Sequence, residues 1–149
     1  MPTIDRNLSG ATAFGKVVVS AADYPPPSGA TSIRGRTRAG WLVRVAERCR
    51  ELFSLPAGWD GYTAQQVDAD LIQKAWDFAQ VAACSVSGEP SVVPTVSGGV
   101  ALEWHARGID LEIELTSTGT IILLEDEAGE VEGPLSEHAE RVAAALHRL

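Results

Sequence analysis

The chain has 149 residues, of which 45% are hydrophobic and 21% are charged, and its formal net charge at pH 7 is −8. This length and composition correspond to a single domain with a real hydrophobic core, which excludes a wholly disordered chain. No apolar run approaches the roughly 18 residues of a membrane span, and the first residues lack the pattern of a secretory signal. We therefore expect a cytoplasmic protein in which both cysteines, Cys49 and Cys84, are small buried apolar residues.

The charge is divided unevenly along the chain. Residues 1–50 hold eight basic and three acidic residues, whereas residues 51–149 hold four basic and 17 acidic ones, so the two parts carry +5 and −13. Residues 1–38 show no sustained hydrophobic period and contain the run Tyr24-Pro25-Pro26-Pro27, which ends helices and central strands. We expect an extended or disordered basic arm, with one edge strand over residues 16–19, followed by a single α+β domain over residues 39–149.

Two amphipathic helices are predicted next. The first covers residues 39–54 and ends near Pro56, because apolar residues recur at three- and four-residue steps: Trp41, Val45, Cys49 and Leu52. The second helix begins near Asp68 or Asp70, either of which can cap it, and runs to about residue 86.

From residue 91 onwards apolar and polar residues alternate, which is the period of a β-strand. Four strands are predicted, over residues 91–96, 100–105, 109–115 and 120–125. Pro94 places the first at an edge of the sheet, and the apolar run over residues 121–124 indicates that both faces of the last strand are partly covered. The short connections predict an antiparallel meander, an acidic loop over residues 125–132 and a final helix over residues 136–149, with the helices on one face.

The polar residues of the second and third strands form the first candidate site. Keeping the apolar side chains together predicts Trp104 opposite Ile109, which also places Glu103 opposite Asp110. Facing carboxylates are unfavourable, so we expect a metal cation, a basic partner or the arginine arm to compensate them. A solvated polar face is the simplest alternative, and a metal-dependent hydrolase would use the four polar side chains of this face: Glu103, His105, Asp110 and Glu112.

A second candidate site is the loop over residues 55–62, which holds two aromatic residues between glycines. Trp59 and Tyr62 could anchor a partner, because rigid aromatic side chains dominate the energetics of interfaces. The interpretation that we favour is structural: both rings fold back as a plug between the helices and the sheet.

This loop and the following strands resemble a group of small, functionally uncharacterised bacterial proteins. The resemblance covers residues 52–124 and consists of a Trp-Asp-Gly-Tyr loop, a helix, a Gly-Gly-x-x-Leu-Glu-Trp strand over residues 98–104 and a Leu-Glu-Ile-Glu strand over residues 111–114. Thr63 stands where a small glycine-like residue is expected. The resemblance is uninformative about activity, because these proteins have no established function to carry over.

Catalytic signatures are missing from the sequence. His138 and His147 are nine residues apart and do not share one face of the final helix, and no zinc spacing, phosphate-binding glycine loop or nucleophile elbow is present. The acidic body repels the phosphates of nucleic acids, so such a contact would have to use the arginines of residues 34–38.

The sequence therefore favours a non-catalytic module that docks on a basic protein partner, in the manner of antitoxins, immunity proteins or phage inhibitors by analogy. A metal-dependent hydrolase and a self-associating structural protein, in which the arm of one copy meets the acidic face of another, are the alternatives. No catalytic residue, metal ligand, cofactor or membrane contact is assigned. The candidate partner-binding residues are Glu103, Asp110, Glu112, Glu114, Trp59, Tyr62, Arg34, Arg36 and Arg38.

Overall fold

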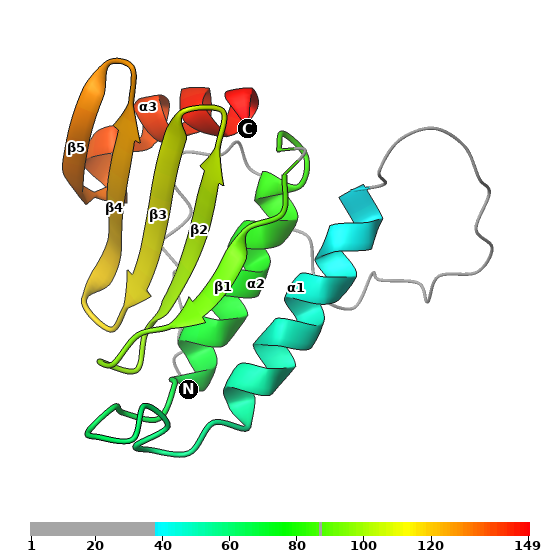
Figure 1. Ribbon diagram of the computed structural model, residues 1–149, viewed down its shortest axis with the longest axis vertical. Coiled ribbons are helices and arrows are strands. Elements are labelled where there is room, and N and C mark those ends of the chain that lie inside the picture. The colour runs from blue at the N-terminus through cyan, green and yellow to red at the C-terminus, as the bar shows by residue number, and fades with distance from the viewer. Residues whose placement is uncertain (1–37, 87) are drawn as a thin grey trace, which may run out of the picture. The chain divides into compact units, whose positions relative to one another are not determined.

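The computed structural model describes residues 38–86 and 88–149 (Figure 1). The elements follow in the order α1 (Arg38–Phe53), α2 (Ala69–Ala82), β1 (Ser91–Pro94), β2 (Val100–Ala106), β3 (Ile109–Thr116), β4 (Gly119–Asp126), β5 (Gly129–Pro134) and α3 (Leu135–Arg148). The α+β class is confirmed. The arm and the strand expected over residues 16–19 lie outside the described residues, except that Arg38 opens α1.

The sheet has five antiparallel strands in the order β1-β2-β3-β4-β5, so the meander is confirmed and the expectation of four strands is wrong. The additional strand is β5, which lies within the segment expected to be an acidic loop. Asp126 pairs with Gly129 across a two-residue turn, and the amide of Ala128 donates to Asp126 Oδ1 at 2.9 Å. The strand was not predicted because Val131 is its single large apolar residue, so the alternation of apolar and polar residues is absent.

All three helices pack on one face of the sheet, α1 against β1, α2 against β2 and β3, and α3 against β3, β4 and β5 (Figure 1). The strand side chains that face these helices are almost completely buried: Leu102, Trp104, Leu111, Ile113, Ile122 and Leu124. Burial of one large apolar side chain contributes about 1.5–3 kcal/mol, so this layer stabilises the sheet that carries the opposite face.

The first helix, α1, ends close to its expected position, whereas α2 is shorter than expected. Asp68 caps α2 by accepting the amides of Asp70 and Leu71 at 2.8 and 3.3 Å, as predicted for one of the two candidates. The helix ends at Ala82, earlier than expected, and Cys84 is exposed in the turn that follows it. The expectation of a buried Cys84 is therefore wrong, whereas Cys49 is buried on α1, and that burial raises the pKa of its thiol.

The register between β2 and β3 differs from the predicted one by two residues. Trp104 lies opposite Leu111 and Glu103 lies opposite Glu112, whereas His105 pairs with Asp110. The difference arises at the turn, because Arg107 and Gly108 have φ angles of 56° and 72° and reverse the chain within two residues. Positive φ at both central positions is the type I′ hairpin turn, which asparagine or glycine usually opens, so arginine gave no signal for it.

Glycine is required at both positions before β2, because a Cβ atom at either one would lie too close to neighbouring atoms. A Cβ atom on Gly99 would lie 2.6 Å from the backbone oxygen of Leu115 and 2.8 Å from Thr95 Oγ1. Gly98 has a φ of +85°, and a Cβ there would lie 2.9 Å from the backbone oxygen of Gln66. The turn thus joins β3 to the loop that precedes α2, and a side chain at either position would separate them.

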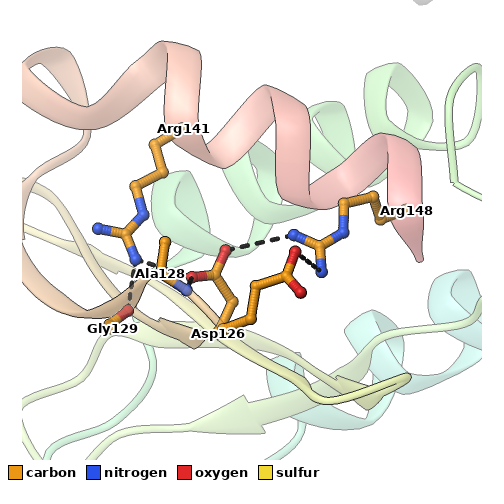
Figure 2. Close-up of polar contacts among 6 residues, drawn as sticks. Asp126, Ala128, Gly129, Arg141 and Arg148 are labelled. Carbon is orange, nitrogen blue, oxygen red and sulfur yellow. Dashed lines mark hydrogen bonds and ion pairs between the residues drawn. The ribbon is translucent and has the colours of Figure 1, made fainter.

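The β4–β5 hairpin is attached to α3 by an acidic and basic cluster (Figure 2). The side chain of Asp126 is 7% exposed, and its Oδ1 lies 2.8 Å from Arg141 Nη2 while its Oδ2 lies 3.5 Å from Arg148 Nη1. Arg141 also donates to the carbonyl oxygen of Gly129. The Ala128 amide and then Arg141 hold the pKa of Asp126 below its usual value, so the carboxylate is ionised where the hairpin meets the helix.

The β1 edge is protected from the side of α1. Arg48 Nε donates to the carbonyl oxygen of Val92 at 3.0 Å, and Arg44 pairs with Glu89 just before the strand. Pro94 ends β1 and has no amide hydrogen to offer. The prediction that this strand lies at an edge is confirmed.

Candidate functional site

The face of the sheet that points away from the helices is the candidate site, and we name it the open face. Because successive side chains of a strand point to opposite faces, the register fixes which residues belong to it. The open face carries the side chains of Ser91, Val93, Ala101, Glu103, His105, Asp110, Glu112, Glu114, Ile121, Leu123, Glu125, Glu130 and Glu132.

The open face is strongly acidic. Its seven carboxylates are Glu103, Asp110, Glu112, Glu114, Glu125, Glu130 and Glu132, and His105 is the single basic side chain among these strand positions. The four predicted acidic residues therefore share one surface, although two of them pair differently from the prediction. Sequence reasoning missed Glu125, Glu130 and Glu132 because it assigned them to a strand end and a loop; the alternation of Glu130 and Glu132 around Val131 was the available signal.

The rows across the strands divide the open face into an acidic end and an apolar end. One row runs from His105 through Asp110 and Glu125 to Glu130. At the other end, Val93, Ala101 and Ile121 share a row with Glu114. Ile121 and Leu123 are 38% and 40% exposed, so this face of β4 is partly covered, as predicted, and still presents apolar area at the surface. A surface with this division can offer both charge and apolar area to one partner.

Glu112 lies at the centre of the acidic surface, and its pKa is raised above the usual value. Partial burial raises its pKa, and the neighbouring Glu103 and Glu114 raise it further. Glu103 is directly opposite Glu112, so the two like charges oppose each other across the ladder. A cation placed over this pair would stabilise both ionised forms.

His105 is held between two carboxylates. Its Nδ1 lies 2.8 Å from Asp110 Oδ1 and its Nε2 lies 3.6 Å from Glu103 Oε2. The hydrogen bond with Asp110 raises the pKa of His105, burial opposes this, and Glu103 adds to the rise. Both ring nitrogens thus favour the imidazolium form, whereas a metal ligand must be the neutral imidazole.

No three histidine, cysteine, aspartate or glutamate side chains in residues 38–86 and 88–149 are grouped so that they could hold a metal ion. The hydrolase hypothesis named Glu103, His105, Asp110 and Glu112, and the observed register pairs Glu103 with Glu112 and His105 with Asp110. The described residues thus give the hydrolase hypothesis no geometric support. The described helices also include none that is long and apolar enough to cross a bilayer.

The two aromatic side chains of the loop over residues 55–62 lie in different environments. Asp60 Oδ1 accepts the amides of Tyr62 and Ala64 at 2.9 and 3.1 Å, which closes the loop on itself. Trp59 is half-buried, and its Nε1 finds no hydrogen-bond partner among the described residues. Tyr62, in contrast, is 85% exposed, so the expectation that both rings form an internal plug is wrong for Tyr62.

The loop is fixed to the apolar end of the sheet. The amides of Gln65 and Asp68 donate to the carbonyl oxygens of Val96 and Gly98, both at 2.9 Å. These carbonyls belong to the connection between β1 and β2, next to the row of Val93 and Ala101. The loop that carries Tyr62 is therefore attached at the end of the sheet where Val93 and Ala101 lie, but Tyr62 is not part of the open face.

The remaining predicted residues are not tested by this geometry. Arg34 and Arg36 lie outside the described residues, and of Arg38 the structure describes only its place at the start of α1. No known protein family, curated protein or solved structure matches the chain. The resemblance to small bacterial proteins over residues 52–124 therefore stays a prediction.

Proposed function

We propose that this protein is a non-catalytic binding module whose open face docks on a basic protein partner. The observation that carries the proposal is the gathering of seven carboxylates on one sheet face, opposed there by a single histidine. Charge complementarity of this kind sets the specificity and the association rate of a complex more than its affinity.

Two features of the open face favour a macromolecular partner. The repulsion between Glu103 and Glu112 is a cost of the free protein that a basic side chain would relieve on binding. The exposed apolar side chains of Ile121 and Leu123 lie beside these carboxylates and supply area that a partner can bury. A basic surface that normally holds nucleic acid has the complementary chemistry, which fits an inhibitory or protective role.

The test is capture of partners from the lysate of the native host on the immobilised protein, with a charge-reversal variant beside it. We expect a basic protein that is retained at about 50 mM salt and released at about 500 mM, because such contacts are screened. The double variant Glu112→Lys and Glu114→Lys should lose it.

The matched control is Glu47→Lys with Asp77→Lys, which changes the net charge equally on exposed positions of α1 and α2. This control should retain the partner. Equal retention by the wild type and the Glu112 and Glu114 variant, with both folded by circular dichroism, would rule out docking through the open face.

A further inference from the structure

The two edges of the sheet differ in the hydrogen-bonding groups that they leave unpaired. At β1, the amide of Thr95 donates to the carbonyl oxygen of Gly99 at 3.0 Å, so the alternation of the ladder turns the groups of Val92 and Pro94 outward. Pro94 has no amide hydrogen, and the Val92 carbonyl accepts from Arg48 at 3.0 Å. The β1 edge therefore offers one outward amide to an incoming strand.

The β5 edge, in contrast, leaves its outward backbone amide and carbonyl groups without hydrogen-bond partners among the described residues. Gly129 pairs with Asp126 across a two-residue turn, and such a flanking pair exchanges both backbone hydrogen bonds. Val131 and Gly133 therefore bond to β4, while the amide and carbonyl groups of Glu130 and Glu132 point away from it. None of the described residues donates to or accepts from these outward groups.

We propose that the β5 edge binds an extended basic segment of the partner as a sixth strand. This inference rests on the proposed function and specifies how the partner is held. Main-chain hydrogen bonds to Glu130 and Glu132 would give affinity, as in other complexes in which a peptide extends a sheet. The side chains of the same two residues lie on the open face, where they continue its acidic row.

Charge selects the sequence of the added strand. Its residues beside Glu130 and Glu132 must be lysine or arginine, because opposite charges across a strand pair are favourable. The residue between them faces the helix side beside the half-buried Val131, where a small apolar side chain fits. The partner segment therefore alternates basic and apolar residues.

The same charges argue against a second copy of the chain as the occupant. Two β5 strands paired edge to edge would place Glu130 and Glu132 of one copy against those of the other. Like charges on facing strands are unfavourable, and charged edge strands prevent such pairing in many proteins.

The start of β5 is fixed by contacts within the free protein. Arg141 of α3 contacts both Asp126 and the carbonyl oxygen of Gly129, which fixes the start of β5 against the helix (Figure 2). A preorganised edge binds a strand with a smaller loss of conformational entropy than a flexible one.

The experiment uses the full chain and a fluorescein-labelled peptide of alternating lysine and valine, about ten residues long to exceed one strand. A peptide of the same composition, with its lysines grouped at one end, is the control. We expect the alternating peptide to bind more tightly by fluorescence anisotropy, and the amide hydrogens of Glu130 and Glu132 to exchange more slowly when it is bound. The already bonded amides of Val131 and Gly133 should change little.

Two substitutions of Glu132 distinguish the contribution of its backbone amide to binding from the contribution of its charge. Glu132→Gln removes the charge and keeps the amide, and we expect about a threefold weaker complex, as for an exposed ion pair. Glu132→Pro also removes the outward amide without breaking a β4–β5 hydrogen bond, and we expect binding about tenfold weaker again. Thermal unfolding shows whether each variant is folded; if the proline variant is not, Glu130→Pro and the exchange of the wild type serve as the test.

Each outcome decides between the two proposals. Equal affinities of the glutamine and proline variants, or unchanged exchange at Glu130 and Glu132 in the bound protein, would overturn strand addition. Docking through the open face would then still stand if the Glu112 and Glu114 reversal abolished binding. No preference for the alternating peptide over the grouped one would also overturn strand addition.

Discussion

Glu103 and Glu112 lie directly opposite each other on β2 and β3, and each is only half-buried on a face that the described helices leave uncovered. Two carboxylates in this position repel each other, and the third, Glu114, stands two residues further along the same strand. The sheet carries this repulsion because its other face is almost completely buried against the helices. The open face is thus a surface whose charge opposes folding, and a cation bound there would stabilise the ionised carboxylates.

Neutralising Glu112 should stabilise the protein. Because burial, Glu103 and Glu114 raise the pKa of Glu112 in the folded state, its ionised form is a cost near neutral pH. We expect Glu112→Gln to raise the free energy of unfolding by about 0.2–1 kcal/mol, measured by urea denaturation. The gain should disappear as the pH falls through the raised pKa, where the wild-type carboxyl is itself neutral. Glu140→Gln on α3 is the control, and an equal gain there would contradict this cause.

The contribution of His105 to stability should depend on pH in the opposite sense. Its folded pKa is raised, chiefly by Asp110, so the stabilisation is complete below its ordinary value of about 6.5 and is lost as the pH rises through the folded value. We expect the wild type to exceed His105→Gln in stability at acidic pH and to approach it at alkaline pH. Asp110→Asn should lower the pKa of His105, measured by NMR titration of the ring; an unchanged titration would contradict the assigned partner.

The attachment of the β4–β5 hairpin to α3 should be sensitive to acid. The pKa of Asp126 is depressed by the Ala128 amide and by Arg141, so its stabilisation is present above the ordinary aspartate value and is lost as the pH falls through the folded one. Asp126→Asn can still accept the Ala128 amide but loses the charge that faces both arginines. We expect this variant to unfold at a lower urea concentration than the wild type near neutral pH, and the difference to vanish in strong acid. Glu127→Gln, which loses one exposed ion pair with Arg148, should have a smaller effect.

A methyl group at Gly99 should disrupt the turn before β2. The Cβ of an alanine there would meet the backbone oxygen of Leu115 at 2.6 Å, and backbone cannot move aside as a flexible side chain does. We expect Gly99→Ala to lower the free energy of unfolding by about 1–3 kcal/mol, the usual cost of overpacking. Gly88→Ala is the control, since its nearest neighbours would lie 3.7 and 4.0 Å away, and it should change stability by less than about 0.5 kcal/mol. Equal effects of the two substitutions would exclude the close approach as the cause.

Most of the fold follows from periodicity, and the errors have local causes. The two-residue alternation around Leu102 and Ile113 predicts β2 and β3, and the repeat of apolar residues in α1 predicts that helix, because both patterns are dominated by burial. The register could not be predicted, since it depends on Arg107 adopting a positive φ that its residue type disfavours. β5 was missed because an edge strand with one large apolar residue has almost no hydrophobic signal.

The candidate site was predicted in its chemistry but not in its extent. Glu103, Asp110, Glu112 and Glu114 share one face as expected, because side-chain alternation survives a register shift of two residues. The shift nevertheless changes which carboxylates face each other, and it pairs His105 with Asp110. Tyr62 was expected to be buried between the helices and the sheet. The sequence shows that an aromatic ring is present, but it does not show how the hydrogen bond to Asp60 folds the loop and so leaves the ring exposed.

The hydrogen bond from Arg48 to the Val92 carbonyl has a consequence for assembly. A filament that grows by edge-to-edge pairing of strands needs two complementary edges on every copy, so that each copy can pair with one neighbour at either edge of its sheet. In this domain Arg48 and Pro94 close the β1 edge, so a copy that gained a strand at β5 would have little to offer to the next. Pairing of the β1 edge with a further strand would therefore be limited to the one outward amide of Val92, which disfavours open-ended growth of the sheet.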